Sequence, residues 1–188
     1  MHKGKLVIIS SPSGGGKTSV IHRLMQRDRH DYRYSVSATT RAPRPGEVDG
    51  TDYIFLSEEV FRAWIDAGRF VEWEHVHKYY YGTPREPIDN WLEEGRIVLL
   101  DIDVKGGIDI KQQFGDRALS IFLDPPSVDA LIERLGNRKT DSQDEIEKRL
   151  TRVPLEVEKG AEYEYRIVNE NLNETVEQVE NIITKHIV

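Results

Sequence analysis

The sequence predicts an α/β fold with a parallel sheet at its core and helices on both faces. Short apolar runs rich in valine, isoleucine and leucine are typical of buried strands, and they cover residues 6–9, 97–102, 119–123 and 166–168. These runs are continuously apolar rather than alternating, which favours parallel strands covered on both faces. Apolar residues recur at helical spacing in residues 128–135, 146–157 and 176–187.

The length of 188 residues predicts one domain, because a domain averages about 150 residues. Residues 34–83 break the rhythm of strands and helices with a Pro/Gly-rich turn and a short helix that stops at Gly68. Residues 136–143 are polar, lie between two helical patterns and are typical of a lid. We therefore expect a core of residues 1–33, 84–126 and 159–188, an insertion of residues 34–83 and a lid region of residues 127–158.

Composition excludes several classes of protein. Cysteine is absent, which rules out disulfide scaffolds, cysteine-ligated zinc and thiol nucleophiles. The net charge of −7, from 33 acidic and 26 basic residues, disfavours broad contact with nucleic acid. The early apolar run of residues 6–9 is too short for a signal peptide or a membrane span. We expect a cytoplasmic protein without nucleic-acid or membrane partners, either a monomer or a weak homo-oligomer.

A glycine-rich segment follows the first predicted strand and precedes a helical stretch, as a phosphate-binding P-loop requires. It matches G-x-x-x-x-G-K-[ST], except that Ser11 replaces the first glycine. Glycines let backbone N–H groups converge on phosphate, Lys17 would reach the β- and γ-phosphates, and Thr18 would hold Mg²⁺. The alternative is a glycine-rich turn with Lys17 as a surface charge. The predicted nucleotide ligands are Ser13, Gly14, Gly15, Gly16, Lys17, Thr18 and Ser19.

Two further segments suggest a second anion site. Arg41 and Arg44 flank Pro43, whose fixed φ stiffens the chain so that both guanidinium groups can face one anion. Downstream lie Glu72-Trp73-Glu74 and the segment 79–83, Tyr-Tyr-Tyr-Gly-Thr. Taken singly, each feature is better explained by solvated surface charges or a strand edge.

Taken together, these segments resemble the guanylate kinase family from about Lys5 to the end of the chain. The matching segments are residues 11–18, 35–44, 46–53, 70–73, 80–83, 100–106 and 125–127. The resemblance implies a nucleoside monophosphate kinase fold with a P-loop core, a GMP-binding insertion and a lid. It also implies transfer of the γ-phosphoryl group from ATP to GMP with Mg²⁺, within purine nucleotide metabolism and GMP recycling.

The resemblance also implies residue roles. For GMP these are Arg41, Arg44, Tyr53 and Tyr81 at the phosphate, and Ser37, Glu72, Thr83 and Asp103 at guanine. For ATP they are the lid arginines Arg134, Arg138 and Arg149 over the phosphates, and Asn169 near adenine. Asp101 would lie near Mg²⁺, directly or through water, although a strand-end cap is the simpler explanation of this residue. The chemistry of Glu72 agrees, because guanine offers donors at N1 and N2 and a carboxylate only accepts.

The chain departs from the family pattern at Ser11, at Lys105, where glutamine is usual, and at Pro154, which predicts a kink or a helix start. Two other functions compete with a guanylate kinase. A kinase-like module that binds phosphorylated peptides would lack the working P-loop formed by Gly16, Lys17 and Thr18. A P-loop kinase for another acceptor is disfavoured by the set of guanine-binding residues.

Overall fold

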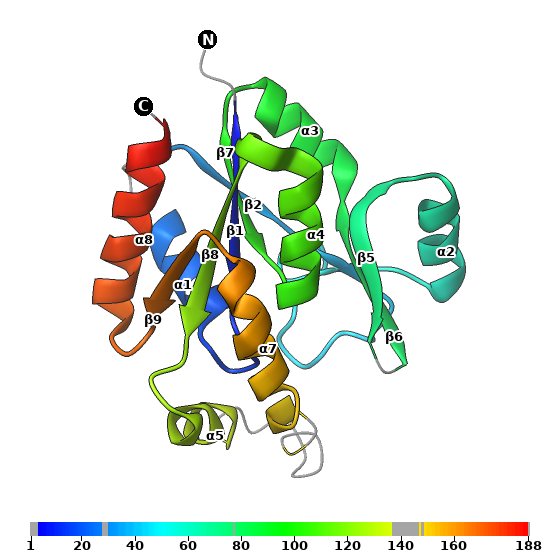
Figure 1. Ribbon diagram of the computed structural model, residues 1–188. Helices are drawn as coiled ribbons and strands as arrows, with labels where there is room; N and C mark the ends of the chain where they lie inside the picture. Colours follow the sequence, from blue (N-terminus) through cyan, green and yellow to red (C-terminus); the bar gives the residue numbers. More distant parts are fainter. Residues whose placement is uncertain (1–3, 28–29, 77, 137–146, 148, 188) are drawn as a thin grey trace.

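A five-stranded parallel sheet forms the core of the computed structural model, which describes residues 4–27, 30–76, 78–136, 147 and 149–187 (Figure 1). The strand order is β2-β7-β1-β8-β9. The bounds are β1 Lys5–Ser10, β2 Tyr32–Ser35, β7 Ile97–Asp101, β8 Ala118–Asp124 and β9 Tyr165–Val168. Every pairing is parallel, so the predicted fold class and all four predicted strands are confirmed. The fifth strand, β2, was not predicted, and the expected boundary between residues 33 and 34 falls inside it.

Helices cover both faces of this sheet, as Figure 1 shows. On one face α1 (Lys17–Met25) and α8 (Leu172–Ile187) pack against Val7 and Ile9 of β1. On the other face α3 (Arg85–Glu93) and α4 (Val104–Phe114) pack against Leu6 and Ile8. Both sets of β1 side chains are buried, which explains the continuous apolar run in its sequence.

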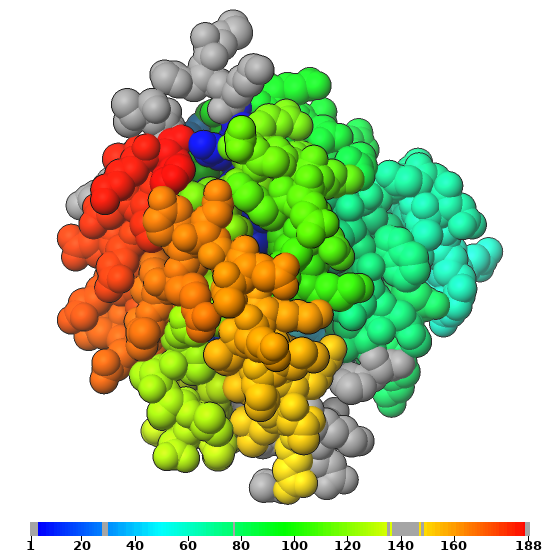
Figure 2. All heavy atoms as spheres, in the orientation of Figure 1, coloured from blue at the N-terminus to red at the C-terminus, as the bar shows by residue number. Residues whose placement is uncertain are grey.

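A second, mixed sheet forms a lobe at the side of the core (Figures 1 and 2). Its order is β4-β3-β6-β5, with bounds β3 Ala38–Thr39, β4 Ile54–Phe55, β5 Phe70–Val76 and β6 Tyr79–Pro84. The helix α2 (Glu58–Asp66) begins where the Ser57 side chain accepts a hydrogen bond from the Val60 N–H. Phe61 of α2 stacks on Phe70 at a centroid distance of 4.4 Å, so the lobe has its own small core.

Two further helices, α5 (Val128–Gly136) and α7 (Val153–Lys159), lie in the expected lid region. The apolar pattern of residues 146–157 predicted a single helix, but residues 151–152 form a turn and α7 begins at Val153. Pro154 lies in the first turn of α7, so the predicted helix start is confirmed. Apart from Gly136, the predicted lid segment 136–143 lies outside the described residues. Within the described part of the chain, every helix is too short or too polar to cross a bilayer.

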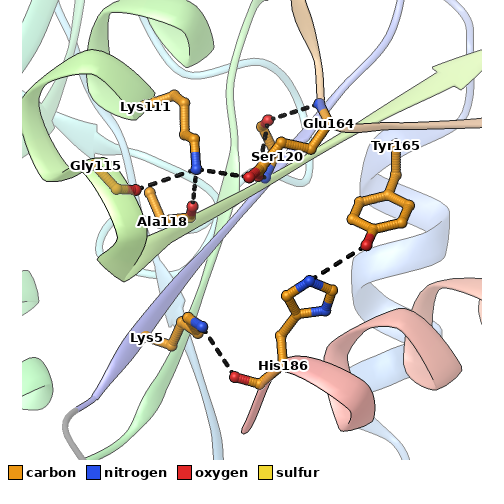
Figure 3. Close-up of polar contacts among 8 residues, drawn as sticks. All are labelled: Lys5, Lys111, Gly115, Ala118, Ser120, Glu164, Tyr165 and His186. Carbon is orange, nitrogen blue, oxygen red and sulfur yellow. Dashed lines mark hydrogen bonds and ion pairs between the residues drawn. The ribbon is translucent and has the colours of Figure 1, made fainter.

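Polar contacts at the amino edge of the core sheet attach α4 and α8 to the strands (Figure 3). The Lys111 ammonium donates to the Ala118 carbonyl at 2.7 Å and pairs with Glu164 at 2.8 Å. The Lys5 ammonium donates to the His186 carbonyl at 2.9 Å. These contacts occupy one edge of the sheet, whereas the P-loop begins at the opposite, carboxyl edge, where ligands bind in open α/β sheets.

Candidate active site

The P-loop, residues 11–16, joins β1 to α1 and depends on two glycines. Gly16 has φ +92° and directly precedes α1, and a Cβ there would lie 2.5 Å from the Asn169 amide nitrogen. A Cβ on Gly15 would lie 2.4 Å from the Ser11 hydroxyl oxygen. The buried Ser11 side chain therefore fits the loop because position 15 has no side chain. Asn169, predicted near adenine, donates from its amide to the Gly15 carbonyl at 2.7 Å.

Lys17 and Thr18 begin α1 beside the ends of neighbouring strands. The Lys17 ammonium donates to the Ser11 carbonyl at 3.3 Å, so it folds back over the loop. The Thr18 hydroxyl donates to Asp101 Oδ2 at 2.6 Å, which brings the two predicted metal ligands together. Among the described residues, no group of three or more histidine or acidic side chains could hold a metal by itself. The pair of Thr18 and Asp101 suits Mg²⁺, which in nucleotide sites uses one or two carboxylates, substrate phosphates and waters.

Side chains from the lid region reach the P-loop at Ser13. The Arg149 guanidinium donates to the Ser13 hydroxyl at 3.3 Å, and the Ser13 N–H donates to the Glu156 carboxylate at 3.4 Å. Arg134 donates to the Asn169 carbonyl at 2.9 Å, and its buried Nη1 has no hydrogen-bond partner among the described residues. Two of the predicted lid arginines thus lie near the loop, whereas Arg138 lies outside the described residues. Glu156 was not predicted from the sequence as a contact of the P-loop.

Three of the predicted guanine ligands, Glu72, Thr83 and Asp103, lie where the second sheet faces α4. The Thr83 hydroxyl of β6 donates to Glu72 Oε1 of β5 at 2.6 Å. A Cβ on Gly106 would lie 3.1 Å from Glu72 Oε2, so the carboxylate lies against the start of α4. Asp103 caps this helix by accepting from the Lys105 N–H at 2.8 Å and the Gly106 N–H at 3.0 Å. Ser37 lies half-buried in the connection from β2 to β3.

The predicted phosphate ligands lie on the same lobe. Arg41 pairs with Glu47 through two hydrogen bonds of 3.0 and 2.8 Å, and its guanidinium lies 5.3 Å from the centre of the Tyr53 ring. The Tyr53 and Tyr81 rings are 6.2 Å apart. The Arg44 N–H donates to Glu47 at 2.7 Å. The hydrogen bond from Arg41 holds the pKa of Glu47 below its usual value, so Glu47 stays ionised and occupies Arg41 until another anion competes.

Burial raises the pKa of Glu72 to about 7, and the nearby Asp103 charge adds to this shift against the hydrogen bond from Thr83. If Glu72 holds guanine as predicted, its carboxylate form would accept from N1–H and N2–H of the base, whereas the protonated form would carry a competing donor. We therefore expect KM for GMP to fall as pH rises through about 7. The GMP phosphate itself loses a proton near pH ~6. A Glu72→Gln variant cannot ionise at this position, so the pH dependence of its KM for GMP reports the GMP phosphate without Glu72. If KM for GMP in the variant depends on pH as it does in the wild type, the assignment is contradicted.

A parallel sheet with a P-loop after its first strand, joined to a lobe that gathers arginine, tyrosine and carboxylate side chains, defines a P-loop kinase with a separate acceptor site. A shikimate kinase from Bacteroides thetaiotaomicron matches with a TM-score of 0.50 and 12% identity, over 96% of this chain and 98% of that one. At this identity the likeness shows the fold alone.

Proteins of higher sequence identity show the family within this class. The family model for guanylate kinase matches residues 3–186. The chain is 42% identical over 181 residues to a guanylate kinase of Synechocystis, covering 96% of this chain and 94% of that one. It is 46% identical over 174 residues to a guanylate kinase of Salinibacter ruber, covering 92% of each. The structure of guanylate kinase from Anaplasma phagocytophilum matches with a TM-score of 0.82 and 31% identity, over 100% of this chain and 88% of that one. The chain belongs to the guanylate kinase family, the ATP:GMP phosphotransferases.

Proposed function

We propose that this chain transfers the γ-phosphoryl group of ATP to GMP, giving ADP and GDP, at the carboxyl edge of the core sheet. The observation that carries the proposal is the connection from β7 to α4. Asp101, the last residue of β7 before this connection, accepts a hydrogen bond of 2.6 Å from the Thr18 hydroxyl at the start of α1. Asp103, two residues later, caps the helix start against which Glu72 lies. One short segment therefore borders both a donor site and an acceptor site.

On the donor side, the backbone N–H groups of the P-loop and the positive end of α1 bind the ATP phosphates. Lys17 leaves the Ser11 carbonyl and neutralises charge on the β- and γ-phosphates. Arg134 and Arg149 approach the same loop from the lid region and add positive charge, in a role that we also assign to Arg138. Asn169 supports the loop through Gly15 and borders the adenine end.

Thr18 and Asp101 supply the hard oxygen donors that Mg²⁺ prefers, so the donor set fits the metal that the family uses. Held by these two residues, Mg²⁺ would supply positive charge that offsets the negative charge of the ATP phosphates. Asp101 holds the Thr18 hydroxyl in place at the start of α1 and keeps it directed toward the phosphate site.

On the acceptor side, Arg41, Arg44, Tyr53 and Tyr81 hold the GMP phosphate. Its arrival would release Arg41 from Glu47. Glu72, Thr83, Asp103 and Ser37 hold the base. A carboxylate suits the N1–H and N2–H donors of guanine, whereas adenine presents an acceptor at N1 and would be repelled.

The reaction needs positioning and charge neutralisation more than covalent help. The attacking oxygen belongs to the GMP phosphate, which is mostly deprotonated at neutral pH, so no base from the protein is needed. Both substrates are polyanions, which explains why a chain of net charge −7 gathers arginine around this site. The P-loop with Lys17 favours this reaction over the alternative of a peptide-binding module.

The test is a coupled assay of ADP release with GMP, AMP, UMP or CMP as acceptor at saturating ATP and Mg²⁺. Turnover with GMP far above the others supports the proposal, and equal turnover with AMP would overturn the guanine assignment. We also propose that the protein works in the cytoplasm without nucleic-acid or membrane partners. Its proposed state is a monomer or a weak homo-oligomer, which sedimentation at several concentrations tests.

Substrate binding is expected to close the second lobe against the core, which would exclude water and suppress ATP hydrolysis. The lobe has a separate core around Phe61 and Phe70, so it can move as a unit. We expect hydrogen exchange in residues 36–83 to slow when a bisubstrate analogue binds. Slowing confined to residues near Lys17 would contradict closure.

A further inference from the structure

A buried pair of hydroxyl groups connects the base of the P-loop to the β7–α4 connection. Ser10, the last residue of β1, is fully buried, and its hydroxyl donates to the Ile102 carbonyl at 2.9 Å. The Asp103 carbonyl lies 3.3 Å from the same hydroxyl. The Tyr163 hydroxyl lies 2.7 Å from Ser10 Oγ and 2.9 Å from the Val104 carbonyl, so its single proton can serve either acceptor.

These hydroxyls act where the backbone ladder ends. The register between β1 and β7 runs to the pair Ile9 and Asp101, and the next hydrogen bond, from the Ile102 N–H to the Ile9 carbonyl, is stretched to 3.5 Å. Beyond this point the P-loop and the α4 connection diverge toward ATP and GMP. Hydrogen bonds from the Ser10 side chain therefore join the end of β1 to the β7–α4 connection where the pairing of β1 with β7 has ended.

The surrounding residues leave room for the phenol. A Cβ on Gly107 would lie 2.0 Å from the Tyr163 hydroxyl oxygen and 3.0 Å from Ser10 Oγ, so glycine is required at this turn of α4. The Tyr163 ring packs against Phe122 of β8 at a centroid distance of 5.6 Å. Burial raises the pKa of Tyr163 above its ordinary value, so the phenol keeps its proton and remains a donor at neutral pH.

We propose that Tyr163 and Ser10 are positioning residues, whose paired hydroxyls fix the P-loop relative to Asp101 and Asp103 and so align ATP with GMP. The proposal rests on the assignment of ATP to the P-loop and of GMP to the site beside Asp103. Neither hydroxyl is exposed to a substrate, because Ser10 is fully buried and Tyr163 is 7% exposed. Their removal should therefore affect alignment more than affinity. Misplacement by about 1 Å can cost about 100-fold in rate.

The main variant is Tyr163→Phe, which deletes the hydroxyl and keeps the ring. We expect kcat to fall about tenfold while KM for ATP and KM for GMP stay near the wild-type values. The matched control is Tyr165→Phe, which loses a hydroxyl contact with His186 of 3.2 Å at the opposite edge of the sheet (Figure 3). It should keep the wild-type kcat even if its Tm falls. All rates are measured well below the lowest Tm of the series.

A second variant, Ser10→Ala, removes the other hydroxyl and should also lower kcat without raising either KM. The double variant should lose less than the sum of the two single losses, because both hydroxyls belong to one connected set of hydrogen bonds. A wild-type kcat in Tyr163→Phe, an equal loss in Tyr165→Phe or additive losses in the double variant would each overturn the proposal. Absence of phosphoryl transfer to GMP in the wild-type protein would instead overturn the proposed function.

Discussion

Replacing Lys17 with alanine is expected to lower kcat by about 100-fold or more while the fold survives. The ammonium lies at the start of α1, and its contacts with Ser11 in the free protein are long, at 3.3 and 3.5 Å. Their loss should cost little stability. In the ternary complex the same charge would stabilise the transferring phosphoryl group. Coupled ADP release measures kcat, and circular dichroism measures folding.

The matched control for this variant is Lys111→Ala. Lys111 donates to the Gly115 and Ala118 carbonyls and pairs with Glu164 at the amino edge of the sheet (Figure 3). This variant should lower Tm and keep kcat, which is the reverse of the Lys17 result. A kcat near wild type for Lys17→Ala would show that ATP does not bind the P-loop as proposed.

The core of the fold could be predicted from the sequence because burial on both faces produces continuous apolar runs, as in Leu6 to Ile9. The strand β2 escaped prediction for the opposite reason. Its sequence, Tyr-Arg-Tyr-Ser, is polar, and the strand lies at the edge of the sheet with β7 as its one neighbour. An edge strand needs no apolar run, so its pairing with β7 could not be found from local pattern.

The candidate site divides in the same way. The P-loop is local, since strand, glycines, Lys17 and Thr18 follow one another, and their spacing alone predicts a loop between a strand and a helix. Contacts between residues far apart in the sequence leave no local pattern from which they could be predicted. Ser13 meets Glu156 across 143 positions, and Ser10 meets Tyr163 across 153 positions. Such pairs can be identified only in the folded structure, where the two segments come together at the carboxyl edge of the sheet.

Replacing Glu72 with glutamine is expected to lower kcat/KM for GMP about 5- to 150-fold, which corresponds to about 1–3 kcal/mol. The Thr83 hydroxyl, which donates to Glu72 Oε1 at 2.6 Å, would hold the amide oxygen in that place. The amide NH₂ would then take the position of Oε2 and face the N–H donors of guanine. GMP is varied at saturating ATP, and KM for ATP should stay near its wild-type value because Glu72 lies on the second lobe, away from the P-loop.

Loss of stability cannot produce this result. Burial raises the pKa of Glu72 to about 7 in the folded protein. The folded protein therefore loses stability as pH rises from the ordinary carboxyl pKa to about 7, because Glu72 must then ionise while buried. A neutral amide removes that cost, so Tm of Glu72→Gln at pH 8 should equal or exceed that of the wild type. The matched control is Glu164→Gln, which weakens contacts with Lys111 and Ser120 far from the cleft and should lower Tm while keeping GMP kinetics. Unchanged GMP kinetics in Glu72→Gln would leave recognition of guanine to Ser37, Thr83 and Asp103.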